Sequence, residues 1–335
     1  MHLRTTLATV TAVLAAATSL SAAGTATAVS VDSAPANACS SSVSLDGFSD
    51  ALNKTTFGGY LVGNLSALAV DKDGSIAALA DRSYLFDLDA KTLAPESVVG
   101  LADEKGAALD SEGLVVDRDG TRLITSETEP SIRRYSADGK ILDRLPVPSS
   151  LLVSPAGRAT SNQTFEGLTL LNGGHTLLAS MEDAISGDTP GTVRFQTWQR
   201  TKDNHFELSA QYAYRTDDPS LGVSEVQALP DGRLLVLERG YKAGVGNTVR
   251  LYLADPRHAT DTSGIDNLTG QADVRLVKKT LLTDIASCPS LGATAKQPQP
   301  NPLLDNIEGM VITGHDKGGY KVLLVSDDNA SAAQS

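Results

Sequence analysis

Pairs of acidic residues recur along this sequence at the two ends of short apolar segments. In the stretch NQTFEGLTLLNGGHTLLASMEDA, residues 162–184, Glu166 precedes one apolar run and Glu182 follows a second run after a Gly-Gly-His turn. Carboxylates that lie close together raise one another's pKa unless positive charge compensates them. Ca²⁺ takes six to eight oxygen ligands, many of them carboxylates. The pattern therefore indicates a site for a divalent cation.

Four further segments repeat this plan of a polar or acidic end, an apolar run, a glycine-containing turn, a second run and an acidic end. Their end residues are Ser66 and Asp81, Glu112 and Glu127, Glu225 and Glu238, and Glu308 and Asp327. The turn glycines supply the positive φ that tight hairpins need. In an antiparallel hairpin the two end residues are cross-strand neighbours, roughly 5 Å apart at Cβ. We therefore expect five β-hairpins whose open ends are polar or acidic.

Further strand-like runs follow four of these hairpins and bring each unit to about four strands. They are Tyr84–Leu88, Ile132–Tyr135, Val193–Trp198, Phe206–Tyr214, Val249–Leu253 and Val274–Leu282. Repeated four-stranded units are typical of β-propeller blades. We predict an all-β fold, a β-propeller of five or six four-stranded blades. A sixth blade could lie in the N-terminal stretch or between Glu225 and Glu308. A β-sandwich is the alternative, but its carboxylates would not repeat in phase.

The fifth hairpin has little sequence after it, so its outer strands must come from elsewhere. We expect the stretch between Val43 and Leu61 to supply them, so that N-terminal strands close the ring. In a propeller the first strand of every blade lines the channel, and all blades point the same way. The acidic ends should therefore gather at one face, around one axis.

The candidate ligands of a cation at that face are the acids at the strand ends and one neighbour of these. They are Glu112, Glu127, Glu166, Glu182, Glu225, Glu308, Asp327 and Asp328. Arg82 and Arg239 each adjoin an acid at the end of a second strand and could compensate charge or stabilise charge that develops on a substrate. The alternative interpretation is that these acids bind backbone N–H groups and arginines of the next blade. We favour Ca²⁺ as the cofactor.

Three longer loops lead directly into the first glutamate of a hairpin and must finish on the acidic face. They span residues 145–164, 215–223 and 288–306, and they are rich in Pro, Ser, Gly and Asn. Loops gathered over one face of a rigid scaffold often carry binding sites.

The first 28 residues have the composition of an export signal. Arg4 precedes the apolar run LATVTAVLAAATSL, and small residues follow at Ala26-Thr27-Ala28. The run is too short for a membrane span, so we expect a secreted protein. The full sequence has 28 Lys and Arg against 40 Asp and Glu, and loss of Arg4 leaves 27 against 40, a formal charge of −13. Such a charge disfavours nucleic acid as a partner.

The sequence contains two cysteines, Cys39 and Cys288, both downstream of the signal. In an oxidising compartment such a pair favours a disulfide. The rival interpretation is lipid attachment at Cys39, but the preceding Ala-Asn-Ala lacks the leucine usual at lipoprotein cleavage sites. We therefore expect the disulfide.

Six short stretches occur in the order found in one protein family. They are DSEG from Asp110, SETEPSIRRYSADGKI from Ser126, NQTFEGLTL from Asn162, LASMED from Leu178, NIEGM from Asn306 and VSDDN from Val325. From about Leu65 to Asn329 the chain resembles the secreted bacterial proteins called "esterase-like activity of phytase", or phytase-like domain proteins. The resemblance implies a propeller-like fold and ester hydrolysis, with most of the acids named above as motif residues. It also implies a strand after VSDDN, where this sequence ends in ASAAQS.

These observations predict three parts of one chain: a signal peptide (1–28), an N-terminal arm with closing strands (29–64) and a phytase-like propeller (65–335) that forms a single domain with the arm. We expect a monomeric, Ca²⁺-assisted hydrolase of phosphate or other esters that acts on a small anionic substrate. The alternative is a non-catalytic propeller that binds a partner or an envelope ligand through its loop-covered face. The lack of a Gly-x-Ser-x-Gly nucleophile motif favours this alternative, and the paired acids favour the hydrolase.

Overall fold

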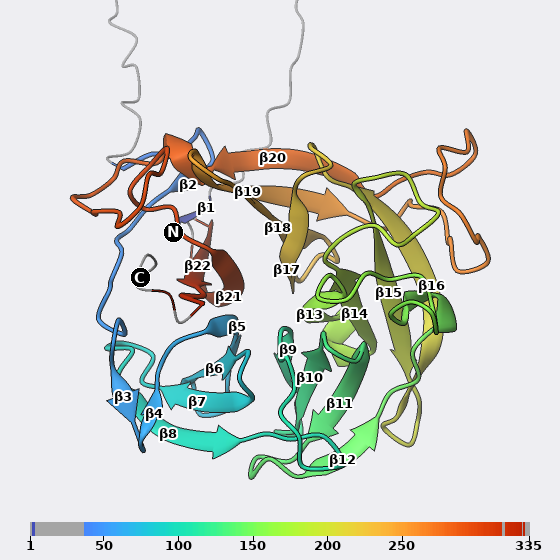
Figure 1. Cartoon of the computed structure of the whole chain (residues 1–335), viewed down its shortest axis with the longest axis horizontal. Helices are drawn as coiled ribbons and strands as arrows, with labels where there is room; N and C mark the ends of the chain where they lie inside the picture. The colour runs from blue at the N-terminus through green and yellow to red at the C-terminus, as the bar shows by residue number, and fades with distance from the viewer. Residues whose placement is uncertain (1, 4–36, 317–318, 330, 332–335) are drawn as a thin grey trace, which may run out of the picture.

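The computed structural model describes residues 2–3, 37–316, 319–329 and 331. Within these residues, antiparallel sheets surround a common axis (Figure 1). Helical structure in the same residues is limited to three short 3₁₀ turns, η1 (Ser149–Leu151), η2 (Asn172–Gly174) and η3 (Ile285–Ser287). The predicted all-β propeller is confirmed. Apart from residues 2 and 3, the predicted export signal lies outside the described residues.

Four sheets each consist of four consecutive strands, and we call them blades 1 to 4. Blade 1 contains β5 (Leu65–Val70), β6 (Ile76–Ala80), β7 (Tyr84–Leu88) and β8 (Pro95–Gly100). Blade 2 contains β9 (Leu114–Val116), β10 (Arg122–Ser126), β11 (Ser131–Tyr135) and β12 (Ile141–Arg144). Blade 3 contains β13 (Phe165–Leu171), β14 (Thr176–Met181), β15 (Thr192–Arg200) and β16 (Phe206–Arg215). Blade 4 contains β17 (Gly222–Ala228), β18 (Leu234–Lys242), β19 (Gly246–Asp255) and β20 (Lys278–Asp284).

The fifth sheet, called blade 5, is built differently. Its inner hairpin is β21 (Ile307–Asp316) with β22 (Gly319–Ser326), and its outer strands are the two-residue β1 (His2–Leu3) and β2 (Val43–Ser44). The N-terminal closure is therefore confirmed for β2, whereas β1 lies within the predicted export signal and outside the stretch expected to close the ring. The rest of the expected stretch instead forms a separate hairpin of β3 (Thr56–Phe57) and β4 (Tyr60–Leu61). Four blades are made of four consecutive strands and the fifth sheet combines both ends of the chain, so the predicted count of five or six blades was slightly off.

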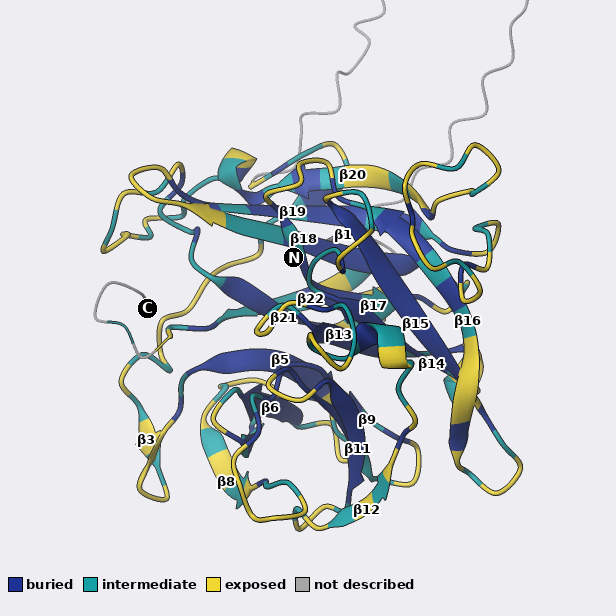
Figure 2. Ribbon diagram, turned by 45° about the vertical axis from the view of Figure 1, so that its right-hand side comes forward, coloured by how far each residue is buried: buried dark blue, intermediate teal, exposed yellow. Residues whose placement is uncertain are grey.

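The first strand of each blade lies innermost, and apolar side chains fill the space between blades. The largest cluster joins blades 2, 3 and 4 and includes Phe165, Phe195 and Trp198. Smaller clusters join blades 4 and 5, blades 1 and 2, and blades 5 and 1. Figure 2 shows the inner strands buried, while exposed residues concentrate on outer strands such as β8 and β16. Apolar and polar residues alternate only weakly along the inner strands, because both faces of these strands are covered.

The inner strands approach one another closely near their first residues, and glycine makes this possible. A Cβ on Gly113 would lie 2.3 Å from the carbonyl oxygen of Glu166, and a Cβ on Gly167 would lie 2.5 Å from the backbone nitrogen of Val226. No side chain fits at these distances. The repeated Glu-Gly pairs are thus a packing requirement at the channel, with the glutamate placed at the channel mouth.

In four blades the strand pairing is irregular near the first residues of the inner strand. The register of the first hairpin shifts between Leu65 and Ala67, between Phe165 and Leu168, between Val223 and Glu225, and between Ile307 and Gly309. A β-bulge of this kind bends the strand and redirects the side chain of the extra residue. The bulges therefore set where each blade's first polar side chain points.

Two contacts hold the ends of the ring together. The Asp328 carboxylate accepts a hydrogen bond from the backbone N–H of Asn64, just before β5, at 2.9 Å. The predicted disulfide is confirmed: Cys39 is bonded to Cys288 across 249 residues of sequence. It joins the arm that carries β2 in blade 5 to the loop that follows blade 4. Both links connect segments that the chain order alone leaves separate.

Removal of the disulfide should lower stability, because the bond restricts a very long loop in the unfolded chain. We expect the double variant Cys39→Ser/Cys288→Ser to lose about 2–5 kcal/mol of unfolding free energy, measured by urea denaturation. Reducing agent should lower the midpoint of the natural chain and leave that of the double variant unchanged. Equal midpoints for the oxidised chain and the double variant would show that the disulfide contributes nothing to the free energy of unfolding.

Candidate functional site

A cavity of about 590 Å³ lies at one mouth of the central channel. The residues around it are Asp81, Asp110, Glu112, Glu127, Asn162, Gln163, Glu166, Glu182, Arg239, Tyr241, Asn247, Gln297, Asn306, Glu308, Asp327, Asn329 and Ser331. Eight of these are carboxylates and one is a cation, Arg239. The lining is therefore strongly acidic in the part of the chain that the structure describes.

The structure brings six of the eight predicted ligands to this cavity. Glu112, Glu166 and Glu308 lie at the first residues of the innermost segments of blades 2, 3 and 5, and Glu127, Glu182 and Asp327 directly follow the second strands of the same blades. Asp81 has the corresponding position after β6 in blade 1. The acids thus converge from four blades around one axis.

Glu225 lies deeper, outside the cavity lining. It is 1% exposed, its Oε1 accepts the N–H of Val226 at 2.8 Å, and backbone groups of Leu168 and Met310 also bond to it. Burial raises its pKa well above the usual value, and these hydrogen bonds oppose the shift. Glu225 therefore links the inner strands of blades 3, 4 and 5.

The position of Glu225 could have been found from its distance to the turn glycine. Ser66, Glu112 and Glu166 each precede a turn glycine by eight residues (74 − 66, 120 − 112 and 174 − 166), whereas Glu225 precedes Gly232 by seven. Ser224 has the spacing of eight, so Ser224 is the equivalent of Glu166, and Glu225 is the equivalent of Gly167. Because strand side chains alternate, one residue of offset turns the carboxylate away from the cavity.

The same offset applies at the other end of the hairpin in blade 4. Val223 pairs with Glu238 as Phe165 pairs with Met181, so the residue that corresponds to Glu182 is Arg239. Glu238 is fully buried, accepts a hydrogen bond from the hydroxyl of Tyr214 at 2.7 Å and pairs with Lys279. Blade 4 thus contributes Arg239 where the other blades contribute an acid.

Two further predicted residues lie away from the cavity. The Asp328 carboxylate accepts the hydrogen bond from the backbone N–H of Asn64 at the ring closure. Arg82 has a side chain that is 62% exposed, and its Nε lies 4.0 Å from Oδ1 of Asp81. Neither residue is part of the cavity lining, so Arg239 is the candidate arginine that the structure brings to the acids.

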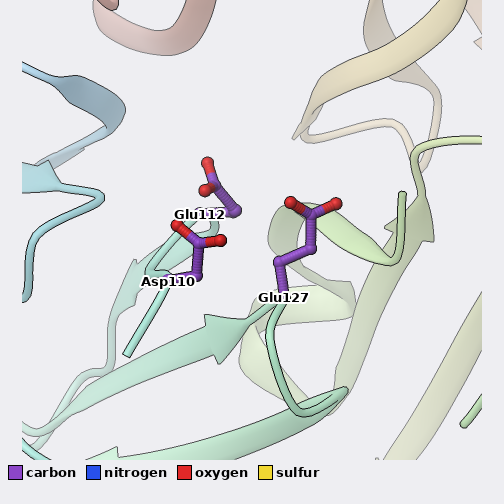
Figure 3. A group of neighbouring side chains, drawn as sticks. All are labelled: Asp110, Glu112 and Glu127. Atoms are coloured by element: carbon purple, nitrogen blue, oxygen red, sulfur yellow. The ribbon is translucent and has the colours of Figure 1, made fainter. Parts of the chain in front are cut away.

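Asp110 was missed as a site residue although it begins the DSEG stretch. It lies two residues before Glu112, and in extended chain residues i and i+2 point to the same side. Asp110, Glu112 and Glu127 direct their carboxylates into a common space (Figure 3), with one oxygen from each within 4.8 Å of the others. Glu127, Glu166 and Glu182 form a second such group. Glu127 belongs to both.

Arg239 compensates part of the negative charge. One of its terminal nitrogens lies 2.8 Å from Oε1 of Glu308, 3.3 Å from Oε1 of Glu182 and 4.0 Å from Oε1 of Glu166. Burial alone would lower the pKa of this guanidinium, but the surrounding glutamates, Glu308 first, outweigh burial and raise it. Arg239 therefore stays charged.

One guanidinium does not offset eight carboxylates, and the pKa values reflect this. Burial, with the charge of Glu182, raises the pKa of Glu127 to about 8. Burial also raises the pKa of Glu308 to about 7 although Arg239 opposes the shift, and that of Asp81 to about 6. Burial and nearby glutamates raise the pKa of Glu112 and of Glu166 well above the usual value. Burial and mutual repulsion therefore disfavour the charged form of these carboxyl groups.

Two of the three predicted loops contribute to the cavity. Asn162 and Gln163 come from the loop at 145–164, and Gln297 and Asn306 come from the loop at 288–306. The loop at 215–223 supplies none of the lining. These amides surround the acids with neutral oxygen and nitrogen atoms.

A secreted protein of Arthroderma benhamiae, described as uncharacterized, is 24% identical over 180 residues, covering 41% of this chain and 35% of its own length. The chain thus aligns with about a third of that relative. Solved structures that share parts of the fold include "Structure of U3-55K" (15% identity, TM-score 0.34, 57% of this chain and 49% of that one) and "Structure of Dos1 propeller" (13%, 0.31, 56% and 43%). TM-scores this low add nothing to the fold assignment.

A family model described as "Phytase-like: Esterase-like activity of phytase" matches residues 61–330. This range contains all four complete blades, the inner hairpin of blade 5 and the cavity residues up to Asn329. The resemblance noted in the sequence is confirmed, and this chain belongs to the phytase-like family named for the esterase-like activity of phytase.

Proposed function

We propose that this protein is an exported, phytase-like hydrolase of phosphate or other small esters, assisted by Ca²⁺ held among the cavity carboxylates. The observation that carries the proposal is the convergence of eight carboxylates and one arginine on one cavity. Membership of the phytase-like family supports ester hydrolysis as the reaction class. The disulfide and the secreted relative support action outside the cell. No helix among the described residues is long and apolar enough to span a membrane.

The residues fit a hard divalent cation. Two groups, Asp110/Glu112/Glu127 and Glu127/Glu166/Glu182, each present three carboxylate oxygens within 4.8 Å of one another, and carboxylate oxygens are preferred ligands of Ca²⁺. Oδ1 of Asp81 is buried and has no hydrogen-bond partner. We therefore assign Ca²⁺ binding to these acids with Glu308 and Asp327. Glu225 and Asp328 are left out because neither belongs to the cavity lining.

A Ca²⁺ ion bound there would polarise an ester oxygen and acidify a water molecule, and it would reverse the local field so that an anionic substrate can enter. Arg239 is the residue that binds an anionic substrate oxygen, because its guanidinium is charged and is held in place by Glu308 and Glu182. No histidine or cysteine lines the cavity in the described residues. We infer that water is the attacking group, since a bound cation would lower its pKa.

Hydrolysis should depend on Ca²⁺ and on Glu166. We expect turnover of p-nitrophenyl phosphate or p-nitrophenyl acetate in Ca²⁺ that is lost in EDTA, and a loss of at least about tenfold in Glu166→Gln, since even outer-shell changes at metal sites cost 10–100-fold. Glu207→Gln, a change of an exposed glutamate on β16, is the matched control and should retain full activity.

Activity that persists in EDTA and in Glu166→Gln would exclude the metal-assisted mechanism. A complete lack of turnover, with Ca²⁺ binding intact by calorimetry, would favour the non-catalytic alternative, a propeller that binds a ligand through its loop-covered face.

Stability without metal should fall as pH rises from about 4.5 to about 8. Unfolded glutamate has a pKa near 4.3, whereas burial raises that of Glu127 to about 8 and that of Glu308 to about 7. The folded state therefore binds more protons than the unfolded state across this window, so unfolding free energy declines with pH. Ca²⁺ should reverse the decline. Thermal unfolding at pH 5 and pH 8, in EDTA and in Ca²⁺, measures both effects.

Glu127→Gln is the informative variant for this pH dependence, because it removes one of the titrating carboxyls. Its stability in EDTA should vary less between pH 5 and pH 8 than that of the natural chain. A natural chain that becomes more stable in EDTA over this range would contradict the electrostatic description of the cavity.

A further inference from the structure

The third strand of blade 5 comes from the segment that we expect to be removed on export. β1 lies between β22 and β2 and runs antiparallel to both (Figure 1). His2 is paired with Ser44 on β2 and with Lys321 on β22. Residues 2 and 3 belong to the predicted export signal, 1–28, so cleavage of the signal would take β1 out of the blade.

Even with β1 in place, the third position of blade 5 is filled over a short length. In blades 1 to 4 the second and third strands are paired at five to nine positions, whereas the described residues of β22 and β1 are paired at one. The second strands β6, β10 and β14 are almost entirely buried. On β22, Leu323, Leu324 and Val325 are only half-buried. Blade 5 therefore has the apolar side chains of a second strand without the cover that a full third strand gives.

Loss of β1 would separate its two neighbours. Strands in a sheet lie about 4.8 Å apart, so β22 and β2 would face each other across about 10 Å with no strand between them. The edge of an apolar strand is a site to which another strand adds. Cys39, which precedes β2, is bonded to Cys288, so β2 is held beside this gap. We call the gap between β22 and β2 the blade 5 slot.

The segment that begins the exported chain has the sequence of a short strand. Residues 29–36, VSVDSAPA, lie outside the described residues. The first four alternate apolar and polar, and valine is favoured in strands. Pro35 ends this pattern, since proline cannot donate to a strand ladder. The segment thus consists of a strand-like part, 29–32, and a connection, 33–36.

The length of the connection allows the strand-like part to reach the slot. Ser44 is paired with His2 on one edge and with Ala38 on the other. Ala38 and the slot therefore lie on opposite sides of β2, about 10 Å apart. Residues 33–36 can span up to about 13 Å when extended. Residues 29–32 can thus lie in the slot while Ala38 keeps its place, and their attachment to the chain gives them a high effective concentration there.

We propose that residues 29–32 of the exported chain replace β1 as the third strand of blade 5, so that the N-terminus created by signal cleavage completes the ring. The proposal rests on export, which is part of the proposed function, and is independent of hydrolysis. The new strand would hold β22, whose last residue, Ser326, directly precedes the cavity residue Asp327. Completion of blade 5 would thereby also position one of the cavity acids.

The test compares hydrogen exchange of β22 in two oxidised chains made directly, 29–335 and 37–335. We expect residues 319–326 to exchange about tenfold or more faster in 37–335, because loss of a strand removes more than one ladder hydrogen bond. A synthetic peptide of residues 29–36 should bind 37–335 one to one and restore slow exchange.

Two variants of 29–335 give a matched comparison. Val31→Pro should make β22 exchange faster, as truncation does, because proline removes a ladder hydrogen bond. Ser33→Pro, in the connection, is the control and should leave exchange unchanged. Exchange of β6 in blade 1 should be the same in every chain, which verifies folding. If 37–335 does not fold, the comparison of these two variants decides the question.

Equal exchange of β22 in 29–335, in 37–335 and in Val31→Pro would overturn the proposal. Protection of β22 that is lost on dilution, together with dimers at high concentration, would assign the slot to a second copy and would also overturn it. Neither result bears on hydrolysis, which the EDTA and Glu166→Gln measurements decide. Protection of β22 that depends on Val31, in a chain without turnover, supports the strand replacement and leaves the proposed hydrolysis unsupported.

Discussion

Repulsion among carboxylates that cannot move apart is the constraint on which the rest of this structure depends. The inner strands approach one another so closely at Gly113 and Gly167 that no side chain fits between them, and this packing fixes the positions of the adjacent glutamates. Burial raises the pKa of Glu112, of Glu127 and of Glu166, and the closeness of the other glutamates raises it further. Ring closure by the disulfide, Asp328 and β2 keeps the strands together against the repulsion. Fold stability and charge density at the cavity are thus opposed.

Much of this arrangement could be predicted from sequence because it repeats. Hairpins with glycine turns and in-phase acids specify the propeller class and bring Glu112, Glu166 and Glu308 to one mouth. The blade count was less certain, because the fifth sheet takes its outer strands from two very short N-terminal segments. Two-residue strands carry no periodicity that a sequence pattern could show.

The errors of placement in blade 4 have a single physical origin. Bulges shift the strand register by one residue, and a shift of one exchanges the two faces of a strand. The pair Glu225 and Glu238 was therefore expected at the cavity, while the residues in the corresponding positions are Ser224 and Arg239. The offset is visible in the sequence, because Ser224 and not Glu225 precedes the turn glycine by eight residues. Asp110 was missed although it lies two residues before Glu112 and therefore on the same side of an extended chain.

The loop at 288–306 joins the covalent structure of the protein to its cavity. Cys288 begins this loop, Asn301 is bonded to the carbonyl oxygen of Cys288 at 2.7 Å, and Gln297 and Gln299 reach the cavity and Asn247. A chain whose thiols are still reduced lacks the anchor at the start of this loop, so one side of its binding pocket is less firmly positioned. Formation of the disulfide therefore positions the loop beside the cavity as well as closing the ring.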